Sequence, residues 1–237
     1  MDSILEWPEN GQTRRARWRS EAGLPLPKNV EVVDDGLSAE AAYQLMAEGR
    51  NLLWRGDWMQ ARNLLQTLTR LTDRHFAARG DTGMPLAEVF ARHRMRQGQR
   101  AALLARLLVP LGPDYKLPLR RAQDVRPACR EAWGKPEGSN SVVALRELLA
   151  VVSAHEWRKK GVPVAAVQGS IHPHYGVFSP VRGEFVDLVA RVPLPVPCDL
   201  AFDIGVGSGI LSAVLARRGV GKIIATDQDE RALACAA

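Results

Sequence analysis

The chain has 237 residues, of which 46% are hydrophobic and 24% are charged, and its formal net charge is +6. This composition is ordinary for a folded globular protein, and no apolar run approaches the ~20 residues of a membrane span, which argues against a disordered chain and against a membrane protein. Three widely spaced cysteines give no disulfide framework or zinc site, and the N-terminus lacks a signal-peptide pattern, so we expect a cytoplasmic protein.

The first residues show little regular patterning. Two tryptophans and four arginines are followed by a stretch with two prolines and then by Asp34-Asp35-Gly36. Turn-forming residues at this density are typical of irregular structure. We therefore predict that residues 1–36 form an irregular N-terminal arm.

Apolar residues with helical spacing follow the arm. The pattern indicates several helices, three of which have a good N-cap residue before their first turn. The predicted caps are Ser38, Asp57 and Ser141; Leu52 and Leu53 lie on the first apolar face, and the run 101–109 predicts a further helix. The sequence thus predicts a helical domain over residues 37–160.

Positive charge is concentrated in part of this predicted domain. Residues 84–130 hold ten Lys/Arg against three acids, a surplus of +7, and residues 14–19 hold four more arginines. Such a surface attracts phosphates, as in RNA or a ribosome. The alternative is a solvated, arginine-rich helix face without a partner. No signature of an RNA-binding module accompanies the charge.

Two short apolar runs, 162–169 and 171–178, meet at a Gly-Ser turn and predict a linking β-hairpin over residues 161–178. His172 and His174 would share one face of the second run, where their two imidazoles could bind a metal ion together with further ligands. No third ligand stands nearby in the sequence. We therefore expect no metal.

The most informative stretch is Asp203-Ile-Gly-Val-Gly-Ser-Gly209. An apolar run at 200–202 precedes it, helical spacing begins at Ile210, and the next apolar run, 223–226, ends in Asp227. The order of strand, glycine-rich turn, helix and strand predicts a βαβ unit with a carboxylate at the tip of its second strand.

This unit has the chemistry of a nucleoside site. Glycines let the backbone approach a ligand, and a carboxylate after the second strand can accept hydrogen bonds from both ribose hydroxyls. The dinucleotide fingerprint needs glycine at position 210, which is isoleucine, so a nicotinamide cofactor is disfavoured. The remaining alternative is a tight turn that binds nothing.

The acid at 203 and the glycines at 205, 207 and 209 resemble the D-x-G-x-G-x-G pattern of class I S-adenosylmethionine-dependent methyltransferases. Upstream, Ser179-Pro-Val-Arg-Gly-Glu184 resembles the I-P-R-P-[DE]-T-E segment of protein-(glutamine-N5) methyltransferases of the HemK/PrmC type. The resemblance implies S-adenosyl-L-methionine as cofactor. The cofactor-binding residues that it implies are Asp203, Gly205, Val206, Gly207, Gly209, Asp227, Gln228, Arg182 and Glu184.

The resemblance also implies an α/β fold: an N-terminal helical domain, a β-hairpin and, over residues 179–237, the first βαβ unit of a Rossmann-like methyltransferase domain. The implied reaction is N-methylation of a protein glutamine or a nucleic-acid base, with a protein or RNA of the translation machinery as substrate. The family's [ND]-P-P-[YF] segment is absent, because no Pro-Pro pair occurs. The catalytic residues are therefore unknown, and we expect the chain to be a fragment. The alternative is a non-catalytic, basic helical module that binds RNA or a ribosome.

Overall fold

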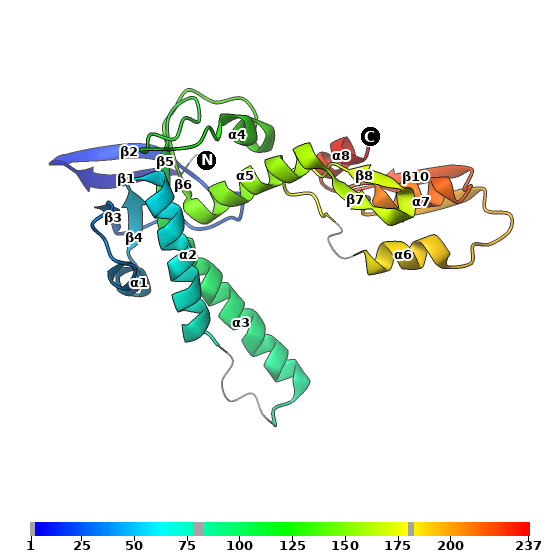
Figure 1. Ribbon diagram of the computed structural model, residues 1–237, viewed down its shortest axis with the longest axis horizontal. Coiled ribbons are helices and arrows are strands. Elements are labelled where there is room, and N and C mark those ends of the chain that lie inside the picture. The colour runs from blue at the N-terminus through cyan, green and yellow to red at the C-terminus, as the bar shows by residue number, and fades with distance from the viewer. Residues whose placement is uncertain (1–2, 78–82, 180–182) are drawn as a thin grey trace. The chain divides into compact units, whose positions relative to one another are not determined.

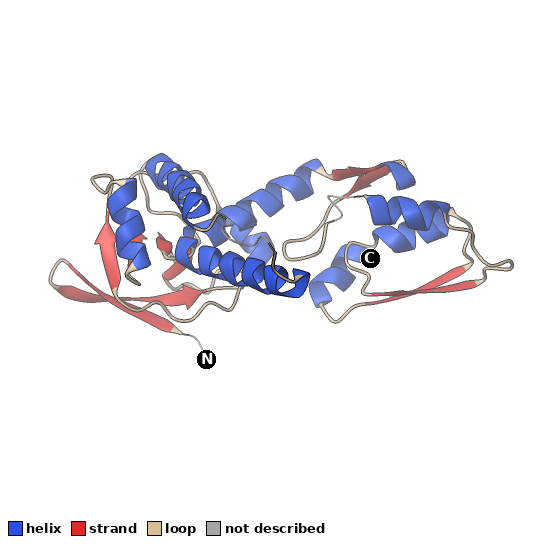
Figure 2. Cartoon of the chain, turned by 90° about the horizontal axis from the view of Figure 1, so that it is seen from below, coloured by secondary structure: helices blue, strands red, loops and turns tan. Residues whose placement is uncertain are grey.

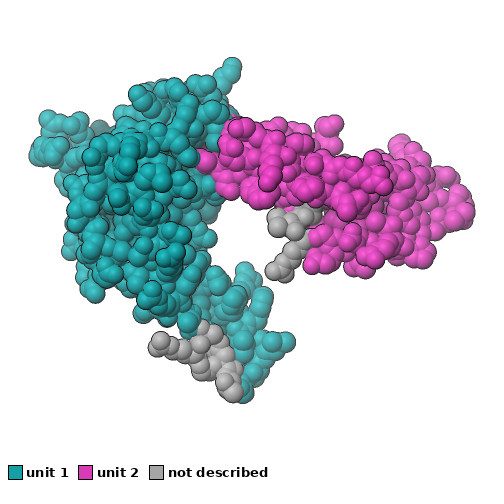
Figure 3. Space-filling view, in the orientation of Figure 1, with its two compact units in different colours: residues 1–130, 135–150 teal, residues 131–134, 151–237 magenta. Residues whose placement is uncertain are grey.

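The structure is a computed structural model that describes residues 3–77, 83–179 and 183–237 (Figure 1). The chain divides into two compact units, and both combine helices with strands (Figures 2 and 3). Unit 1 comprises Met1–Arg130 and Lys135–Ala150, and unit 2 comprises Glu131–Gly134 and Val151–Ala237. Among the described residues, no helix has the length and apolar character needed to cross a lipid bilayer.

Unit 1 begins with a β-hairpin, so the predicted irregular arm is wrong. Strand β1 (Ile4–Glu9) pairs antiparallel with β2 (Gln12–Arg19). The two residues between them, Asn10 and Gly11, both have left-handed backbone angles, with φ of 54° and 73°. Asn-Gly is the strongest sequence signal for a two-residue hairpin turn, because both residues tolerate positive φ.

The hairpin belongs to a six-stranded mixed sheet with the order β1-β2-β6-β5-β4-β3. The other strands are β3 (Val30–Val33), β4 (Asn51–Trp54), β5 (Leu107–Leu111) and β6 (Ser141–Ala144). Strands β3, β4 and β5 are mutually parallel, β6 is antiparallel to β5, and β2 is parallel to β6. The outermost strands β1 and β3 also contact each other, so the sheet curls into a nearly closed barrel.

This sheet overturns the predicted N-terminal helical domain. Leu52 and Leu53 lie in β4, Leu107 begins β5, and Val142 lies in β6. The four residues of β4 and of β6 and the five of β5 are almost entirely buried, so they lack the alternation that marks a half-exposed strand. A short apolar run that is buried on both faces has no periodicity of its own. These runs were therefore assigned to the helices predicted on either side of them.

The first five helices in the described part of the chain are α1 (Ala39–Ala47), α2 (Trp58–His75), α3 (Leu86–Leu104), α4 (Arg126–Trp133) and α5 (Leu145–Lys160). Three of them lie wholly within unit 1, and α4 and α5 run from unit 1 into unit 2. Two of the three caps predicted here are used: the side chain of Ser38 accepts a hydrogen bond from the amide of Ala41, and that of Asp57 accepts from the amides of Met59 and Gln60. The third prediction is wrong, because Ser141 lies in β6. Helix α2 buries one apolar stripe, and α3 buries only Leu104.

Unit 2 contains a short hairpin and a parallel βαβ unit. Its hairpin strands are β7 (Val162–Val164) and β8 (Gly169–Ile171), with a 3-10 turn, η1 (Ala165–Val167), between them. The later elements are α6 (Glu184–Arg191), β9 (Leu200–Ile204), α7 (Ile210–Arg217), β10 (Lys222–Thr226) and α8 (Glu230–Ala236). Strands β9 and β10 pair in parallel. Val164, Val186, Ile210 and Val214 form a small core between these elements.

The cysteines differ sharply in environment, which predicts a labelling pattern. Cys129 in α4 is fully buried, and burial raises the pKa of its thiol to about 12. Cys198 and Cys235 are partly exposed. Because the thiolate is the reactive form, we expect Ellman's reagent at neutral pH to modify Cys198 and Cys235 in the folded protein, and Cys129 only after denaturation. Peptide mass spectrometry identifies the sites, and rapid modification of Cys129 without denaturant would contradict this expectation.

Candidate functional site

The segment Asp203–Gly209, which we call the glycine turn, connects β9 to α7. Gly205, Gly207 and Gly209 have φ of 87°, 52° and 77°, in the left-handed region that disfavours a Cβ atom. A Cβ placed on Gly205 or Gly207 would meet no heavy atom within 4 Å, so open space lies beside both residues. A Cβ on Gly209 would come within 3.1 Å of the Ala236 Cβ, so this glycine permits α8 to pack closely.

Hydrogen bonds tie the glycine turn to the end of β10. The amides of Gly205 and Val206 both donate to the Thr226 carbonyl, at 2.8 and 2.9 Å. The amide of Gly207 donates to Asp227 Oδ2 at 3.0 Å. The structure thus brings the glycines and the carboxylate of Asp227 together at the same end of the two parallel strands.

Asp227 keeps its charge at neutral pH. Its Oδ1 accepts a hydrogen bond from the amide of Asp229 at 3.0 Å, and this bond and the one from Gly207 lower the pKa of the carboxyl group. Each carboxylate oxygen has two acceptor lone pairs. An ionised Asp227 therefore retains capacity to accept hydrogen bonds from the hydroxyl groups of a ligand.

Asp203 is used inside the protein. It is only 8% exposed, and its Oδ2 accepts hydrogen bonds from the Ser212 hydroxyl at 2.6 Å and the Ser212 amide at 3.1 Å. These bonds fix the first turn of α7 beneath the glycine turn. Ser212 did not enter the sequence-based prediction, and its only signal was a hydroxyl side chain early in the helix that follows the motif.

The other predicted cofactor-binding residues are not all connected to the glycine turn. Val206 is a buried residue of the glycine turn, and Gln228 is exposed directly after Asp227. Glu184 is the exposed first residue of α6, and no hydrogen bond or ion pair in the described part of the chain joins it to the glycine turn. Arg182 lies outside the described residues.

The two histidines of the hairpin region are not paired in a ligand set. His172 Nδ1 lies 2.6 Å from the Arg158 carbonyl, which it can meet with an N–H. His174 is half-buried, and burial lowers the pKa of its imidazole. Among the described residues, no group of three or more His, Cys, Asp or Glu side chains is arranged to hold a metal ion.

One face of the β9–β10 sheet is covered by α7 and the other is open. The side chain of Asp203 points to the covered face, where it meets Ser212. Phe202 and Ile204 alternate with it and are 60% and 76% exposed, with Ile224 of β10 directly beside Phe202. Parallel sheets are usually covered on both faces, so within the described residues this apolar stripe is a surface available for packing.

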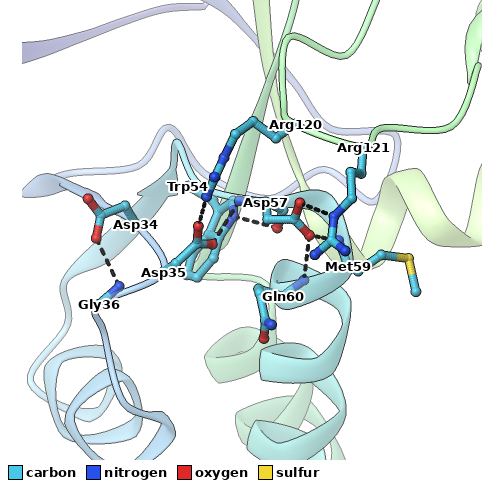
Figure 4. Close-up of polar contacts among 9 residues, drawn as sticks. All are labelled: Asp34, Asp35, Gly36, Trp54, Asp57, Met59, Gln60, Arg120 and Arg121. Atoms are coloured by element: carbon cyan, nitrogen blue, oxygen red, sulfur yellow. Dashed lines mark hydrogen bonds and ion pairs between the residues drawn. The ribbon is translucent and has the colours of Figure 1, made fainter.

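A second cluster of charged side chains lies in unit 1, past the carboxyl ends of β3 and β4 (Figure 4). Asp35 accepts hydrogen bonds from the amide of Asp57, at 2.7 Å, and from Arg120, while Asp57 accepts from Arg121 Nε at 2.6 Å. A hollow of about 430 Å³ is lined by these four residues and Gln60. Both carboxylates are matched by protein donors, so we assign the cluster a structural role in joining the loop after β5 to the start of α2.

No known protein-family model matches the chain, and no curated protein matches it. The geometry defines an α/β protein whose second unit carries a glycine-rich βαβ turn beside an ionised carboxylate.

Proposed function

We propose that unit 2 binds S-adenosyl-L-methionine and that the protein is an S-adenosylmethionine-dependent methyltransferase acting on a nitrogen of a protein glutamine or a nucleic-acid base. The observation that carries this proposal is the placement of the Asp227 carboxylate 3.0 Å from the Gly207 amide, beside the open space at Gly205 and Gly207. A vicinal diol needs an acceptor, and a cofactor lying against the backbone needs residues without side chains.

The hydrogen bonding of the turn favours a nucleoside over a dinucleotide. A pyrophosphate is bound by free backbone N–H groups. Here the amides of Gly205 and Val206 donate to the Thr226 carbonyl, and that of Gly207 donates to Asp227. The negative charge of Asp227 would also repel a phosphate. A neutral ribose hydroxyl pair fits this donor and acceptor set better.

In the proposed reaction the cofactor supplies an activated methyl group on its sulfonium. The protein then has to bind and align the reactants rather than form a covalent intermediate. Asp227 orients the ribose through its acceptor oxygens, Gly205 and Gly207 leave room for the cofactor, and Asp203 holds the turn through Ser212.

Isothermal titration with S-adenosylhomocysteine tests the proposal. We expect binding with a micromolar dissociation constant and about a ten- to hundredfold loss in Asp227→Asn, because a charged acceptor becomes a neutral amide. Glu230→Gln is the matched control. It removes the same charge from an exposed position in the first turn of α8 and should leave binding unchanged. Absent binding by the wild type, or equal affinity of Asp227→Asn, would refute the proposal.

A further inference from the structure

We propose that helices α2 and α3, which we call the basic arm, bind single-stranded RNA. This inference goes beyond the proposed methyltransfer, because it concerns unit 1 and requires no cofactor. The two helices lie side by side and extend away from the six-stranded sheet (Figure 1).

The basic arm carries most of the positive surplus of the protein. Its two helices contain seven arginines and two acids, a surplus of five positive charges in a chain whose net charge is +6. The arginines are Arg62, Arg70, Arg74, Arg92, Arg94, Arg96 and Arg100, and the acids are Asp73 and Glu88. Such a concentration of charge attracts a polyanion over a distance of about one Debye length, ~8–10 Å at physiological salt.

Helix α3 of the arm is almost entirely exposed, since its one buried residue is Leu104. Arg100 of α3 pairs with Asp73 in the last turn of α2 through Nε at 2.5 Å, which fastens the two helices together. A helix that buries so little apolar surface gains little from its own packing, so its long exposed face has room for a partner.

On α2, three arginines form a regular row. Arg62, Arg70 and Arg74 are spaced by eight and four residues, so they share one face of the helix, and all three are exposed. Within the described residues, none of the three makes an ion pair with an acidic side chain. With a rise of 1.5 Å per residue, they span roughly 18 Å, a length suited to several successive phosphates.

The exposed face of α3 adds an aromatic platform. Leu86, Phe90 and Arg94 recur every four residues, so they lie on one face, and Leu86 and Phe90 are 83% and 60% exposed. The Arg94 guanidinium lies 6.0 Å from the centroid of the Phe90 ring. An exposed ring beside a cation is the arrangement on which an unpaired base stacks while its phosphate meets the arginine.

This platform favours a polyanion with unpaired bases over a duplex or an acidic protein. Bases of a DNA duplex are paired and stacked inside the helix, whereas RNA presents unpaired bases in loops and ends. An acidic protein surface would neutralise the arginines, but it would gain nothing specific from the Phe90 ring. The contribution of Phe90 therefore distinguishes the two classes of partner.

The test uses the full chain without cofactor and fluorescence anisotropy of a labelled oligouridine of about 20 nucleotides, titrated between about 50 and 200 mM salt. Phe90→Ala should weaken binding roughly five- to a hundredfold, since the stacking of one base is removed. Arg74→Gln/Arg94→Gln should weaken binding to oligouridine and oligoadenosine alike. It should also make the log–log salt slope shallower by about 1.4, or ~0.7 for each phosphate that is no longer neutralised.

The control variant Lys28→Gln/Lys135→Gln removes two charges from exposed positions of unit 1 outside the basic arm, and it should bind RNA as the wild type does. All these side chains are exposed, so the thermal midpoint should stay constant across the series. The inference fails if the wild type does not bind oligouridine, if the control loses as much affinity as Arg74→Gln/Arg94→Gln, or if polyglutamate binds as tightly and is equally sensitive to Phe90→Ala. Binding of S-adenosylhomocysteine is read separately, so failure of one proposal leaves the other measurable.

Discussion

Replacing Asp57 with alanine is expected to lower the thermal midpoint of the protein by roughly 10 °C, because three separate interactions are removed at one buried side chain. Asp57 is only 3% exposed. Its Oδ1 accepts hydrogen bonds from the amides of Met59, at 2.8 Å, and Gln60, at 3.3 Å, and its Oδ2 accepts one from Arg121. The alanine variant leaves the start of α2 uncapped and removes the bond between Arg121 of the loop after β5 and the start of α2.

The neighbouring contacts explain why this position matters. The Asp57 amide donates to Asp35, and the Asp57 carbonyl accepts from the Trp54 indole at 3.0 Å (Figure 4). The backbone of Asp57 is therefore held by one side chain from the loop after β3 and by one from β4. The hydrogen bond from Arg121 lowers the pKa of the Asp57 carboxyl. A lowered pKa in the folded state stabilises the protein above the unfolded value, near 4, and this contribution is lost as the pH falls below it.

Thermal melts followed by circular dichroism, at pH 7 and pH 3.5, measure both effects. The difference in thermal midpoint between the wild type and Asp57→Ala should be larger at pH 7 than at pH 3.5. Asp34→Ala is the matched control, because Asp34 is exposed and its side chain accepts, among the described residues, one hydrogen bond, from the amide of Gly36 at 3.0 Å. A similar loss in Asp34→Ala, or a gap independent of pH, would show that the junction does not contribute as described.

The six-stranded sheet of unit 1 shows where sequence patterns lose their value. Strands β4 and β6 have four residues each, which is about one helical turn. A run this short cannot be assigned to a strand or a helix from the spacing of its apolar residues, and helices flank both strands. The Asn10-Gly11 turn was a usable signal, since Leu5 and Trp7 alternate toward the core before it. The arginines of β2 were interpreted as a charge cluster, so the alternation of buried and more exposed residues along the strand was missed.

Local constraints made the segment from β9 to β10 easier to predict. Its strand, glycine turn, helix and second strand are encoded by neighbouring residues, and the structure has these elements at Leu200–Ile204, Ile210–Arg217 and Lys222–Thr226. The sequence pattern did not predict which side chains pack against or hydrogen-bond to each other. The approach of Ala236 to Gly209 and the bond from Arg120 to Asp35 join residues far apart in sequence, and only the folded chain brings them together.

Substituting valine for Gly207 should abolish the binding of S-adenosylhomocysteine while leaving a folded protein. At φ of 52° a β-branched residue is strained, at a cost of ~1–2 kcal/mol. Its side chain would also occupy the space next to the turn, where no heavy atom lies within 4 Å of a Cβ. If the cofactor rests in that space, affinity should fall by more than about a hundredfold, because displacement of the ligand adds to the disturbed bond between the Gly207 amide and Asp227.

Gly219→Val separates the ligand effect from the backbone effect. Gly219 has φ of 85°, equally open surroundings and a position at the end of α7, so its substitution costs about the same ~1–2 kcal/mol in stability without touching the glycine turn. Calorimetric titration and thermal melts of both variants give four values. Equal stabilities with binding abolished only in Gly207→Val place the ligand against the turn. Equal binding by both variants would mean that the space beside Gly207 holds no cofactor, and the glycines would then serve only the tight connection between β9 and α7.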